Sequence, residues 1–502
     1  MSRLANTTEE IREQVAGSLI PTSAINRPPI MRPQPIVRIF NAYFPARTLL
    51  LALSELIMMF LALVAATYAR FRADGTLLLF YENGWERIGM VCLVCLLCLY
   101  YYDLYHSTIL ASAREVFIRL VQVVGTACII LAVLYYLFPS LQIRSSLFMP
   151  AVLFMGACLV GWRKLFSVVN GSPTLAERTA LLGAGPLALS LAKEISSRPE
   201  LGFRLIGFVA DGAKSPAVLN GLDHIGDSQE IVDVVMAEQI HRLIVTMSEQ
   251  RGRLPVEQLL ELKARGVLVQ DGPAFYETLT GKIALESLRL SELVFGPGFF
   301  APGGLQLYKR ISSLVISLIC LVPALPLMGL IALAIWFDSG KPILFRQRRV
   351  GKGGKIFTLY KFRSMKAAGN GNASGNGKIQ PAQEMDERFT RVGRWVRRLR
   401  VDELPQLYNI LRGDMHFVGP RPFMLEEEEE FAKQIPLYKY RWAVNPGATG
   451  WAQIHRPYCA TLEDNKDKLS YDLFYIKNMS VGLDLLIIFQ TVKTLILGRG
   501  AR

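Results

Sequence analysis

The residues of this chain that could do chemistry gather between Phe357 and Pro422. An adjacent pair of carboxylates, Asp402 and Glu403, stands near the centre of this stretch. Guanidinium groups bind phosphate oxygens in a forked geometry, so a cluster of them beside two acids indicates a site for a phosphorylated ligand. Basic residues of the stretch that could serve such a site include Lys361, Arg363, Arg394, Arg397, Arg398, Arg400 and Arg421.

A short helix is expected directly after the pair. The segment from Leu404 to Leu411 carries apolar residues at helical spacing, and Pro405 is tolerated in a first turn, where its missing N–H is not needed. Asp402 would then lie at or just before the helix N-terminus. Unpaired amides and the positive end of the helix dipole favour an anion at that position.

An aspartate in this setting can attack phosphorus as a covalent nucleophile and form an acyl phosphate. The substrate's negative charge must be neutralised first, which arginines and a divalent ion bridging phosphate oxygens would do. The simpler interpretation is a solvated ion-pair network at a helix N-cap, which suits an isolated Asp-Glu pair. This pair is not isolated, because further motifs surround it.

Six segments follow one another in a fixed order: Gln347–Gly351, Lys361–Met365, Asp402–Leu407, Gly413–Met415, Val418–Pro422 and Pro446–Gln453. In this order they resemble bacterial polyprenyl-phosphate hexose-1-phosphate transferases, the sugar transferase family that starts exopolysaccharide and O-antigen assembly. The resemblance covers roughly Leu305 to Arg502. The chain also looks like the long form of that family, and its tail is similar to the exosortase-associated exopolysaccharide subgroup. The tail segments concerned are Tyr471–Asn478 and Gly498–Arg502.

The resemblance implies a reaction in which a UDP-sugar donates its sugar-1-phosphate to undecaprenyl phosphate and releases UMP. Asp402 would attack the β-phosphorus, and Glu403 would support Mg²⁺, the expected cofactor, or a proton. Asp402 and Glu403 together are the expected metal ligands. The expected phosphate partners are Arg397, Arg421, Lys361 and Arg363. Gln453 and Trp451 are candidates for shaping the nucleotide pocket, although for Trp451 we favour a place in the core.

One segment departs from the family pattern. His455–Tyr458 stands where many members carry an Asn-Gly-Arg-Asn-like loop, so nucleotide or sugar contacts there are not carried over. A Gly- and Asn-rich segment at residues 367–377 is expected to be a mobile loop.

Composition points to a membrane protein, because 51% of the 502 residues are hydrophobic. The net charge of +14 suits anionic lipid and phosphorylated substrates. We expect no nucleic acid partner, since no DNA- or RNA-binding pattern accompanies the charge. Cys92, Cys95 and Cys98 have metal-like spacing, but within an apolar run they are expected to be small apolar residues on a membrane helix.

Four apolar segments are near the length that crosses a bilayer: Leu49–Tyr68, Ile88–Tyr102, Ile118–Phe138 and Ser146–Trp162. They predict a four-helix transmembrane bundle over residues 48–165, after a disordered tail over residues 1–47. Arginine and lysine residues are more frequent before the first segment, between the second and third, and after the fourth than in the connection between the third and fourth. The positive-inside rule therefore places the N-terminus and everything after Trp162 in the cytoplasm. Glu55, inside the first segment, is either a functional intramembrane acid or, as we favour, a residue that pairs within the bundle or snorkels.

Residues 175–298 have the composition of a Rossmann-like α/β domain. Gly183 and Gly185 belong to a G-x-G-x-x-A turn between a buried strand and a helix, which is one form of a dinucleotide fingerprint. Pro186 removes one amide from this turn, and Asp211, the acidic residue after the next strand, comes later than the fingerprint expects. Cofactor binding and a packing or regulatory role are both open, and we favour the second.

Residues 305–502 are predicted to form a mixed α/β catalytic domain. Tyr308–Phe337 is apolar and long enough to span the membrane, but Pro323 and Pro326 interrupt it. The family has a re-entrant helix here, with a Ser-Pro at its break, and Pro326 follows a leucine instead. We therefore expect a re-entrant helix at 308–337, broken at Pro326, with a kinked fifth span as the alternative. Val481–Leu497 is expected to lie on the membrane interface.

The fold class expected from these parts is a multi-domain membrane protein of the bacterial inner membrane, with a cytoplasmic catalytic domain. A homodimer is compatible with it. Two other functions were considered. A membrane-bound NAD-dependent nucleotide-sugar dehydratase needs a Tyr-x-x-x-Lys pair, which this sequence lacks. A non-catalytic scaffold for polysaccharide export would not require the ordered C-terminal motifs.

Overall fold

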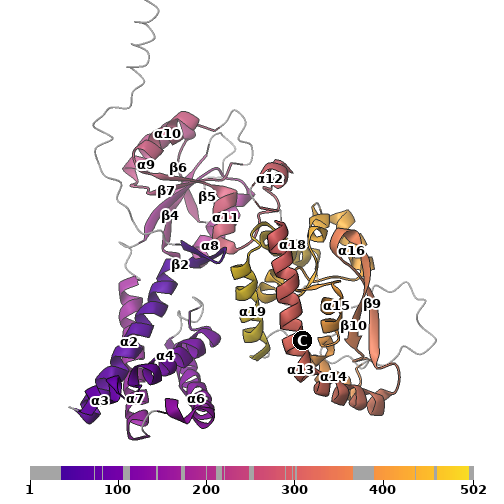
Figure 1. The fold of residues 1–502 in the computed structure, drawn as a ribbon. Helices are drawn as coiled ribbons and strands as arrows, with labels where there is room; N and C mark the ends of the chain where they lie inside the picture. Colours follow the sequence, from indigo (N-terminus) through magenta and orange to yellow (C-terminus); the bar gives the residue numbers. More distant parts are fainter. Residues whose placement is uncertain are drawn as a thin grey trace, which may run out of the picture. The chain divides into compact units, whose positions relative to one another are not determined.

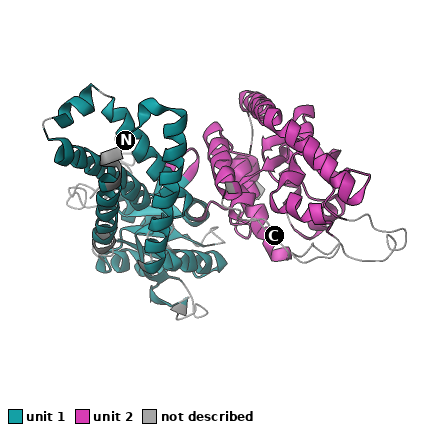
Figure 2. Cartoon of the chain, turned by 90° about the horizontal axis from the view of Figure 1, so that it is seen from below, with its two compact units in different colours: residues 1–37, 43–279 teal, residues 38–42, 280–502 magenta. Residues whose placement is uncertain are grey.

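The computed structural model of the chain is shown in Figure 1. Contacts divide the chain into two compact units, one of residues 1–37 and 43–279 and the other of residues 38–42 and 280–502 (Figure 2). The structure describes residues 36–496 except 73, 82, 106–112, 143–144, 171–175, 199–200, 211–217, 220, 248–253, 289, 297, 300–301, 366–388, 436 and 457–460.

Four long helices form the bundle at the start of the first unit: α2 (Ala46–Phe71), α4 (Gly84–Tyr101), α6 (Ala113–Leu137) and α7 (Ser145–Asn170). They coincide with the four predicted spans, and α2 packs along α7 while α4 packs along α6. Within the described residues, α2, α4 and most of α6 are long and apolar enough to cross a membrane. A short helix, α3 (Asp74–Phe80), and a 3-10 turn (Pro139–Leu141) lie in the connections.

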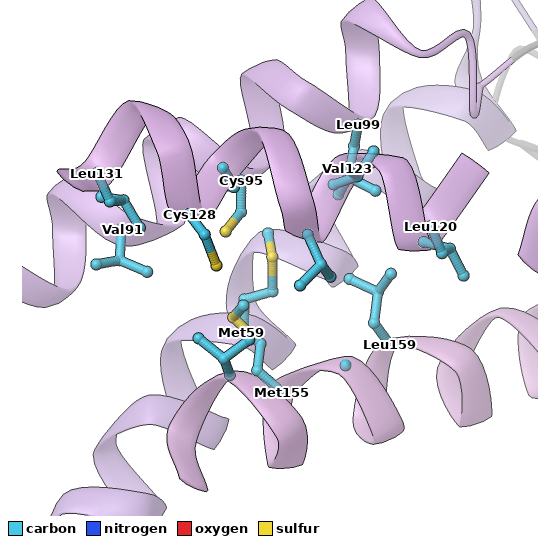
Figure 3. Close-up of a pocket in the computed structure, with 14 residues that line it drawn as sticks. Met59, Val91, Cys95, Leu99, Leu120, Val123, Cys128, Leu131, Met155 and Leu159 are labelled. Carbon is cyan, nitrogen blue, oxygen red and sulfur yellow. The ribbon is translucent and has the colours of Figure 1, made fainter. Parts of the chain in front are cut away.

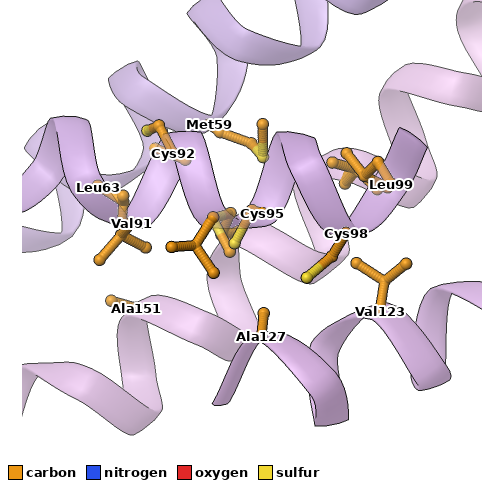
Figure 4. Close-up of a cluster of buried hydrophobic side chains, with 14 of the residues drawn as sticks. Met59, Leu63, Val91, Cys92, Cys95, Cys98, Leu99, Val123, Ala127 and Ala151 are labelled. Atoms are coloured by element: carbon orange, nitrogen blue, oxygen red, sulfur yellow. The ribbon is translucent and has the colours of Figure 1, made fainter. Parts of the chain in front are cut away.

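The core of the bundle is apolar and rich in sulfur. Cys92, Cys95 and Cys98 are buried on α4 against Met59 of α2 and Val123 of α6 (Figure 4). This confirms the prediction that the three cysteines act as small apolar core residues. Figure 3 shows an apolar pocket between the same helices, lined by side chains that include Met59, Cys95, Cys128 and Met155.

One buried ion pair crosses this core. Glu55 is fully buried, and Arg163 of α7 donates to it through Nε (2.5 Å to Oε1) and Nη2 (3.1 Å to Oε2). The hydroxyl of Tyr105 donates to Glu55 Oε2 at 2.7 Å. Glu55 therefore pairs within the bundle, as one of the two predictions for it stated.

The predicted disordered tail is wrong over its last residues. β1 (Ile36–Ile39) and β2 (Ala42–Pro45) form a hairpin, in which Phe40 and Asn41 take the positive φ angles of a two-residue turn. Its tip belongs to the second unit: Arg38 Nη2 donates to Asn478 Oδ1 (3.1 Å) and Asn41 Nδ2 to the Asn478 carbonyl (3.2 Å). β-branched and aromatic residues on both sides of an asparagine were the sequence signal for this hairpin.

The middle domain contains a six-stranded sheet in the order β5-β6-β4-β3-β7-β8, with β5 antiparallel and the other pairs parallel. Buried apolar clusters lie on both faces, one with α8 and α11 and one with α9 and α10, which is the layering of a doubly wound α/β fold. The strands are β3 (Glu177–Leu182), β4 (Phe203–Val209), β5 (Val218–Leu219), β6 (Leu222–Gly226), β7 (Arg242–Val245) and β8 (Leu268–Asp271). The helices are α8 (Pro186–Ser197), α9 (Ile231–Ala237), α10 (Val256–Ala264) and α11 (Gly272–Thr280), with a 3-10 turn at Ser228–Glu230.

The second unit is mostly helical around two small sheets. Its strands are β9 (Leu344–Val350) and β10 (Ile356–Phe362), which are antiparallel, and β11 (His416–Val418) and β12 (Gly447–Thr449), which are parallel. Its helices are α12 (Leu290–Phe295), α13 (Gly303–Ser339), α14 (Arg391–Arg398), α15 (Gln406–Arg412), α16 (Leu425–Gln434), α17 (Trp451–His455), α18 (Leu462–Lys477) and α19 (Val481–Ile496). Three 3-10 turns complete it: Lys352–Gly354, Val401–Glu403 and Tyr438–Ala443.

Helix α13 has 37 residues, is long and apolar enough to cross a membrane, and contains Pro323 and Pro326. Its ribbon changes direction within its length (Figure 1). Both of its ends contact the same unit, because Lys309 Nζ donates to the Val418 carbonyl (3.2 Å) and Asp338 Oδ2 accepts from the Val392 amide (3.1 Å). A straight helix of this length would be about 55 Å long.

Candidate active site

The carboxylate pair lies in the 3-10 turn Val401–Glu403, between α14 and α15. Arg400 enters this turn in the left-handed region (φ 56°), and Pro405 precedes α15. The predicted helix is present but starts at Gln406, four residues after Asp402, and has only seven residues. The charge around the pair therefore comes mainly from side chains, and less from the helix dipole than the sequence suggested.

Two cations hold Glu403. Arg421 Nη2 donates to Glu403 Oε1 at 2.8 Å, and Lys361 Nζ donates to the same oxygen at 3.3 Å. Burial acts to raise the pKa of Glu403, but Arg421, Lys361 and Arg400 outweigh it and hold that pKa well below the usual range. Glu403 is therefore ionised and fixed in place by its neighbours.

Asp402 differs from Glu403 although it is adjacent. Within the described residues, no side chain donates a hydrogen bond to Asp402 and no salt bridge includes it, whereas Glu403 has two. Burial and the negative charge of Glu403 raise the pKa of Asp402 to about 6, against the opposite effect of Lys361, Arg397 and Arg421. At neutral pH Asp402 is thus a mostly ionised carboxylate that keeps its lone pairs free and is more basic than an ordinary aspartate.

The hairpin of β9 and β10 delivers Lys361 to this site. Lys361 is the penultimate residue of β10, opposite Phe345. Asn409 of α15, fully buried, ties the helix to the strand: its Nδ2 donates to the Thr358 carbonyl (2.7 Å) and its Oδ1 accepts from the Tyr360 amide (3.2 Å). This clamp fixes the strand that carries Lys361 against the helix that follows Glu403.

Helix α14 delivers Arg397. The helix is capped by Thr390, whose hydroxyl accepts from the Gly393 amide at 2.9 Å. Gly393 lies so close to the chain at Ser364 that an added Cβ would be 2.0 Å from the Ser364 carbonyl oxygen. The guanidinium of Arg397 lies 4.9 Å from the centre of the Phe389 ring and lowers the pKa of Asp402. Arg397 therefore lies near Asp402, and its phosphate-binding role stays a prediction.

The residues Val418–Pro422, which we call the Arg421 loop, are held by their backbone. Four carbonyls of this loop accept hydrogen bonds from elsewhere in the unit. Lys309 Nζ donates to the Val418 carbonyl (3.2 Å), and the Gly447 amide donates to the Pro420 carbonyl (2.9 Å). Arg441 Nη2 donates to the Arg421 carbonyl (2.7 Å), and Arg349 Nη1 donates to the Pro422 carbonyl (3.1 Å). The loop is therefore rigid, which fixes the origin of the Arg421 side chain.

Sequence reasoning missed the cations that hold this loop. Arg349 lies in the Gln347–Gly351 motif, which was a usable signal. Arg441 is buried in an ion-pair network, with Nε 2.8 Å from Asp472 Oδ2 and Nη1 3.1 Å from Glu428 Oε1, and nothing in the sequence around it marked it. Lys309 is buried near the start of α13, where its ammonium lies 2.8 Å from Asp484 Oδ2 of α19.

Arg363 does not have the predicted phosphate-binding role in this structure. Its Nη2 donates to the carbonyls of Ser339 (2.6 Å) and Gly340 (2.7 Å) and contacts the Ser339 hydroxyl, so it caps the C-terminus of α13. Strand β10 ends at Phe362, and Arg363 is buried beyond it. The Arg363 guanidinium therefore joins the C-terminus of α13 to the segment that follows β10.

Gln453 and Trp451 lie on α17, after β12. Trp451 is buried, stacks on Phe474 and donates from Nε1 to the Gly281 carbonyl (2.9 Å), so it is a core residue. Gln453 Nε2 donates to the Ala448 carbonyl (3.1 Å), and its Oε1 is buried without a hydrogen-bond partner among the described residues. Among the described residues, no hydrogen bond or ion pair joins Gln453 or Trp451 to the carboxylate pair. The residues at 367–377 and 457–458 lie outside the described part of the chain.

The two glycines of the turn in the middle domain differ in their surroundings. Gly183 has a φ of 115°, and an added Cβ there would lie 3.0 Å from the Thr246 hydroxyl and 3.1 Å from Met247. The Thr246 hydroxyl donates to the carbonyls of Leu182 (2.9 Å) and Gly183 (3.2 Å). Helix α8 begins with Pro186 directly after Gly185. Gly183 thus makes the tight turn expected of the first glycine of the fingerprint, while a Cβ added at Gly185, where a pyrophosphate would approach, meets nothing within 4 Å. The packing around the two glycines leaves both predictions for this domain open. Asp211 lies outside the described residues.

A model of the bacterial sugar transferase family matches residues 305–498, and a model described as a CoA-binding domain matches residues 101–262. The chain is 41% identical, over 45% of its length and 52% of the relative's, to a UDP-N-acetylgalactosamine-undecaprenyl-phosphate N-acetylgalactosaminephosphotransferase of Aeromonas hydrophila. It is 33% identical, over 70% of its length and 65% of the relative's, to an undecaprenyl-phosphate glucose phosphotransferase of Komagataeibacter xylinus.

A third relative is matched over more of its own length. This is a UDP-glucose:undecaprenyl-phosphate glucose-1-phosphate transferase of Caulobacter vibrioides, to which the chain is 39% identical over 39% of its length and 74% of the relative's. The chain spans about half to two thirds of the length of the first two relatives. The family model covers every residue of the carboxylate site, from Lys361 to Arg421. The chain therefore belongs to the bacterial sugar transferase family.

Proposed function

We propose that this protein transfers a sugar-1-phosphate from a UDP-sugar to undecaprenyl phosphate and releases UMP, as the first membrane step of exopolysaccharide assembly. The observation that carries the proposal is the unequal partnering of two adjacent acids: Glu403 is held by two cations, while no residue in the described part of the chain forms an ion pair with Asp402. The relatives named above, which act on undecaprenyl phosphate, support the substrate class.

In the first step a carboxylate oxygen of Asp402 attacks the β-phosphorus of the donor. A bond forms between this oxygen and phosphorus, and the bond from phosphorus to the bridging oxygen breaks, so that UMP leaves with the electron pair. The guanidiniums of Arg397 and Arg421 and the ammonium of Lys361 stabilise charge on the diphosphate oxygens. Glu403 keeps Arg421 and Lys361 in position for this task.

In the second step a phosphate oxygen of undecaprenyl phosphate attacks the same phosphorus. The bond between phosphorus and Asp402 breaks, and the aspartate returns to the carboxylate form. The products are undecaprenyl diphosphate sugar and free enzyme. Two in-line displacements through one side chain allow the water-soluble donor and the lipid acceptor to bind in turn.

The donor set of the site fits Mg²⁺. Within the described residues there is no cluster of three or more acidic, histidine or cysteine side chains that could hold a metal. Mg²⁺ commonly takes one or two carboxylates and completes its shell with substrate phosphates and water, so Asp402 and Glu403 would suffice. The ion would neutralise charge on the diphosphate.

We further propose that α13 is re-entrant and that the catalytic unit lies at the cytoplasmic face of the inner membrane. The contacts of Lys309 and Asp338 with one unit support this arrangement, since a spanning helix would carry its ends to opposite faces. Proline breaks at Pro323 and Pro326 suit a change of direction. On the donor side, UDP-sugars are available only in the cytoplasm.

Purified full-length protein with Mg²⁺, a panel of UDP-sugars and undecaprenyl phosphate tests the activity by UMP formation. Donor without acceptor should leave a phosphosugar adduct that intact-protein mass spectrometry detects. Asp402→Asn should abolish both UMP release and the adduct, and Glu429→Gln, on the exposed side of α16, is the matched control. Normal turnover by Asp402→Asn would end the covalent mechanism.

The topology has its own test. Cysteine is introduced at Gly304 or Lys341, near the two ends of α13, or at Ser140, in the connection between α6 and α7. Membrane-impermeant maleimide is then applied to spheroplasts and to inverted vesicles. We expect the first two positions to react only in inverted vesicles and Ser140→Cys only in spheroplasts. Labelling of Gly304→Cys and Lys341→Cys from opposite sides would mean that α13 crosses the membrane.

A further inference from the structure

Helix α14 has a second face that the reaction does not use. Along one side of this helix and its C-cap, positions i, i+3 and i+7 carry arginine, and positions i+4 and i+8 carry large apolar side chains. Trp395 and Leu399 are each 64% exposed, and the guanidinium of Arg398 lies 5.9 Å from the centre of the Trp395 ring. We call this side the outward face of α14, and its exposed residues are Arg391, Arg394, Trp395, Arg398 and Leu399.

The other side of α14 is committed to the protein. Val396 is buried with Ile331 and Ile335 of α13, and the Val392 amide donates to Asp338. Arg397 is the arginine of this helix that lies near Asp402, whereas the three arginines of the outward face are exposed. The arginine cluster in the sequence therefore divides into one active-site residue and a separate basic surface.

The outward face lies next to the apolar surface of a membrane helix. α14 packs against the C-terminal half of α13 (Figure 1), and that half exposes Leu330, Leu333, Trp336 and Phe337. Tryptophan and phenylalanine at the end of an apolar helix belong at the boundary between hydrocarbon and headgroups. Wherever α13 enters the bilayer, its neighbour α14 is placed at headgroup depth.

A mixed face of this kind matches the chemistry of an anionic phospholipid. Arginine binds phosphate oxygens, and exposed tryptophan and leucine side chains enter the acyl boundary between them. Each cation close to an anionic membrane strengthens the association roughly fivefold. The proposed transfer reaction does not use these three arginines.

We propose that the outward face of α14 is a docking surface for the anionic phospholipids of the surrounding bilayer, and that it sets the depth of the carboxylate site relative to the headgroups. The inference rests on the proposed function only for the position of the site at the membrane. It predicts that Trp395 is in contact with anionic lipid whether or not turnover occurs.

The test uses full-length protein in nanodiscs of phosphatidylcholine with a fraction of phosphatidylglycerol and no polyprenyl phosphate. Bromine is placed on the acyl chains of either lipid, and the fluorescence of Trp395 is obtained as the difference between the wild-type protein and Trp395→Phe. We expect brominated phosphatidylglycerol to quench Trp395 more strongly than brominated phosphatidylcholine at the same mole fraction.

Three variants make the result specific. Arg391→Gln, Arg394→Gln and Arg398→Gln combined should equalise the two lipids, and the three corresponding lysine substitutions should retain the preference. A control triple variant, Arg348→Gln, Lys355→Gln and Lys433→Gln, removes the same charge from exposed positions on β9, the turn after it and α16. Equal quenching in the wild-type protein, no quenching by either lipid, or the same loss in the control would overturn the proposal. These readouts need no donor, so they remain valid if the transfer reaction itself is not observed.

Discussion

The pKa of Asp402 gives a quantitative prediction for the first half-reaction. Attack requires the carboxylate, and the pKa of Asp402 is raised from 3.8 to about 6 by burial and by Glu403. The ionised fraction then falls from about nine tenths at pH 7 to about one tenth at pH 5. UMP release should therefore slow about tenfold over this interval. An aspartate with its ordinary pKa would lose less than about a tenth of its activity.

The acceptor must be left out of this assay, because a phosphate monoester titrates near pH 6 itself. Single-turnover UMP release from the donor, measured between pH 5 and pH 8, isolates the step on Asp402. Return of each sample from pH 5 to pH 7 should restore the rate, which controls for unfolding. A rate that stays level down to pH 5 would refute the account of Asp402.

The variant Glu403→Gln tests the cause of the shift. It removes the neighbouring negative charge that raises the pKa of Asp402, and it also releases Arg421 and Lys361 to act on Asp402 instead. Both effects lower the pKa of Asp402, so the acid limb of the profile should move to lower pH even though the maximal rate falls. An acid limb that stays in place would show that the titrating group is another residue.

Three further variants probe the supports of the site. Gly447→Ala places a Cβ 2.0 Å from the Gly419 amide nitrogen, so the Arg421 loop must shift; UMP release should fall strongly while expression in the membrane persists. Arg441→Met leaves Asp472 buried without its partner and should lower the stability of the unit by roughly 3–5 kcal/mol, seen as earlier thermal unfolding in detergent. Arg363→Gln should reduce kcat and thermal stability with little change in KM for the donor, because the side chain caps α13; a rise in KM alone would restore its predicted phosphate-binding role.

The predicted site residues that the structure places beside the carboxylate pair share one property: their effect depends on charge over several ångströms. Lys361 and Arg421 both reach the carboxylate pair, although they bind Glu403 and not Asp402. Arg363 failed because its role depends on where a strand ends. Had β10 continued, alternate residues Lys361 and Arg363 would share a face, but the strand stops at Phe362. The sequence does not state that end point.

The membrane part was predictable because its signal is a simple one of length and hydropathy. Each of the four N-terminal spans appears as a helix that covers most of its predicted range, although α7 continues to Asn170, beyond the predicted end at Trp162. The doubly wound order of the middle sheet follows from alternating strands and helices. The rigid Arg421 loop could not be predicted. Lys309 binds the loop from more than a hundred positions earlier in the chain, and Arg441 binds it from a 3-10 turn that no sequence pattern marks. Such contacts exist only once the chain has folded.

The hairpin tip at residues 38–42 has a consequence for biogenesis. Arg38 and Asn478, which share a hydrogen bond, are separated by 440 positions, so a segment translated before the first membrane helix waits for nearly the whole polypeptide to be synthesised before it meets its partner. The entropic penalty of closing so long a loop rises only slowly with its length, so the delay is kinetic more than energetic. Until Asn478 is synthesised, the residues at 38–42 lack this partner, and a chaperone at the ribosome could cover them. A fragment that begins at Thr280 would lack the hairpin tip altogether.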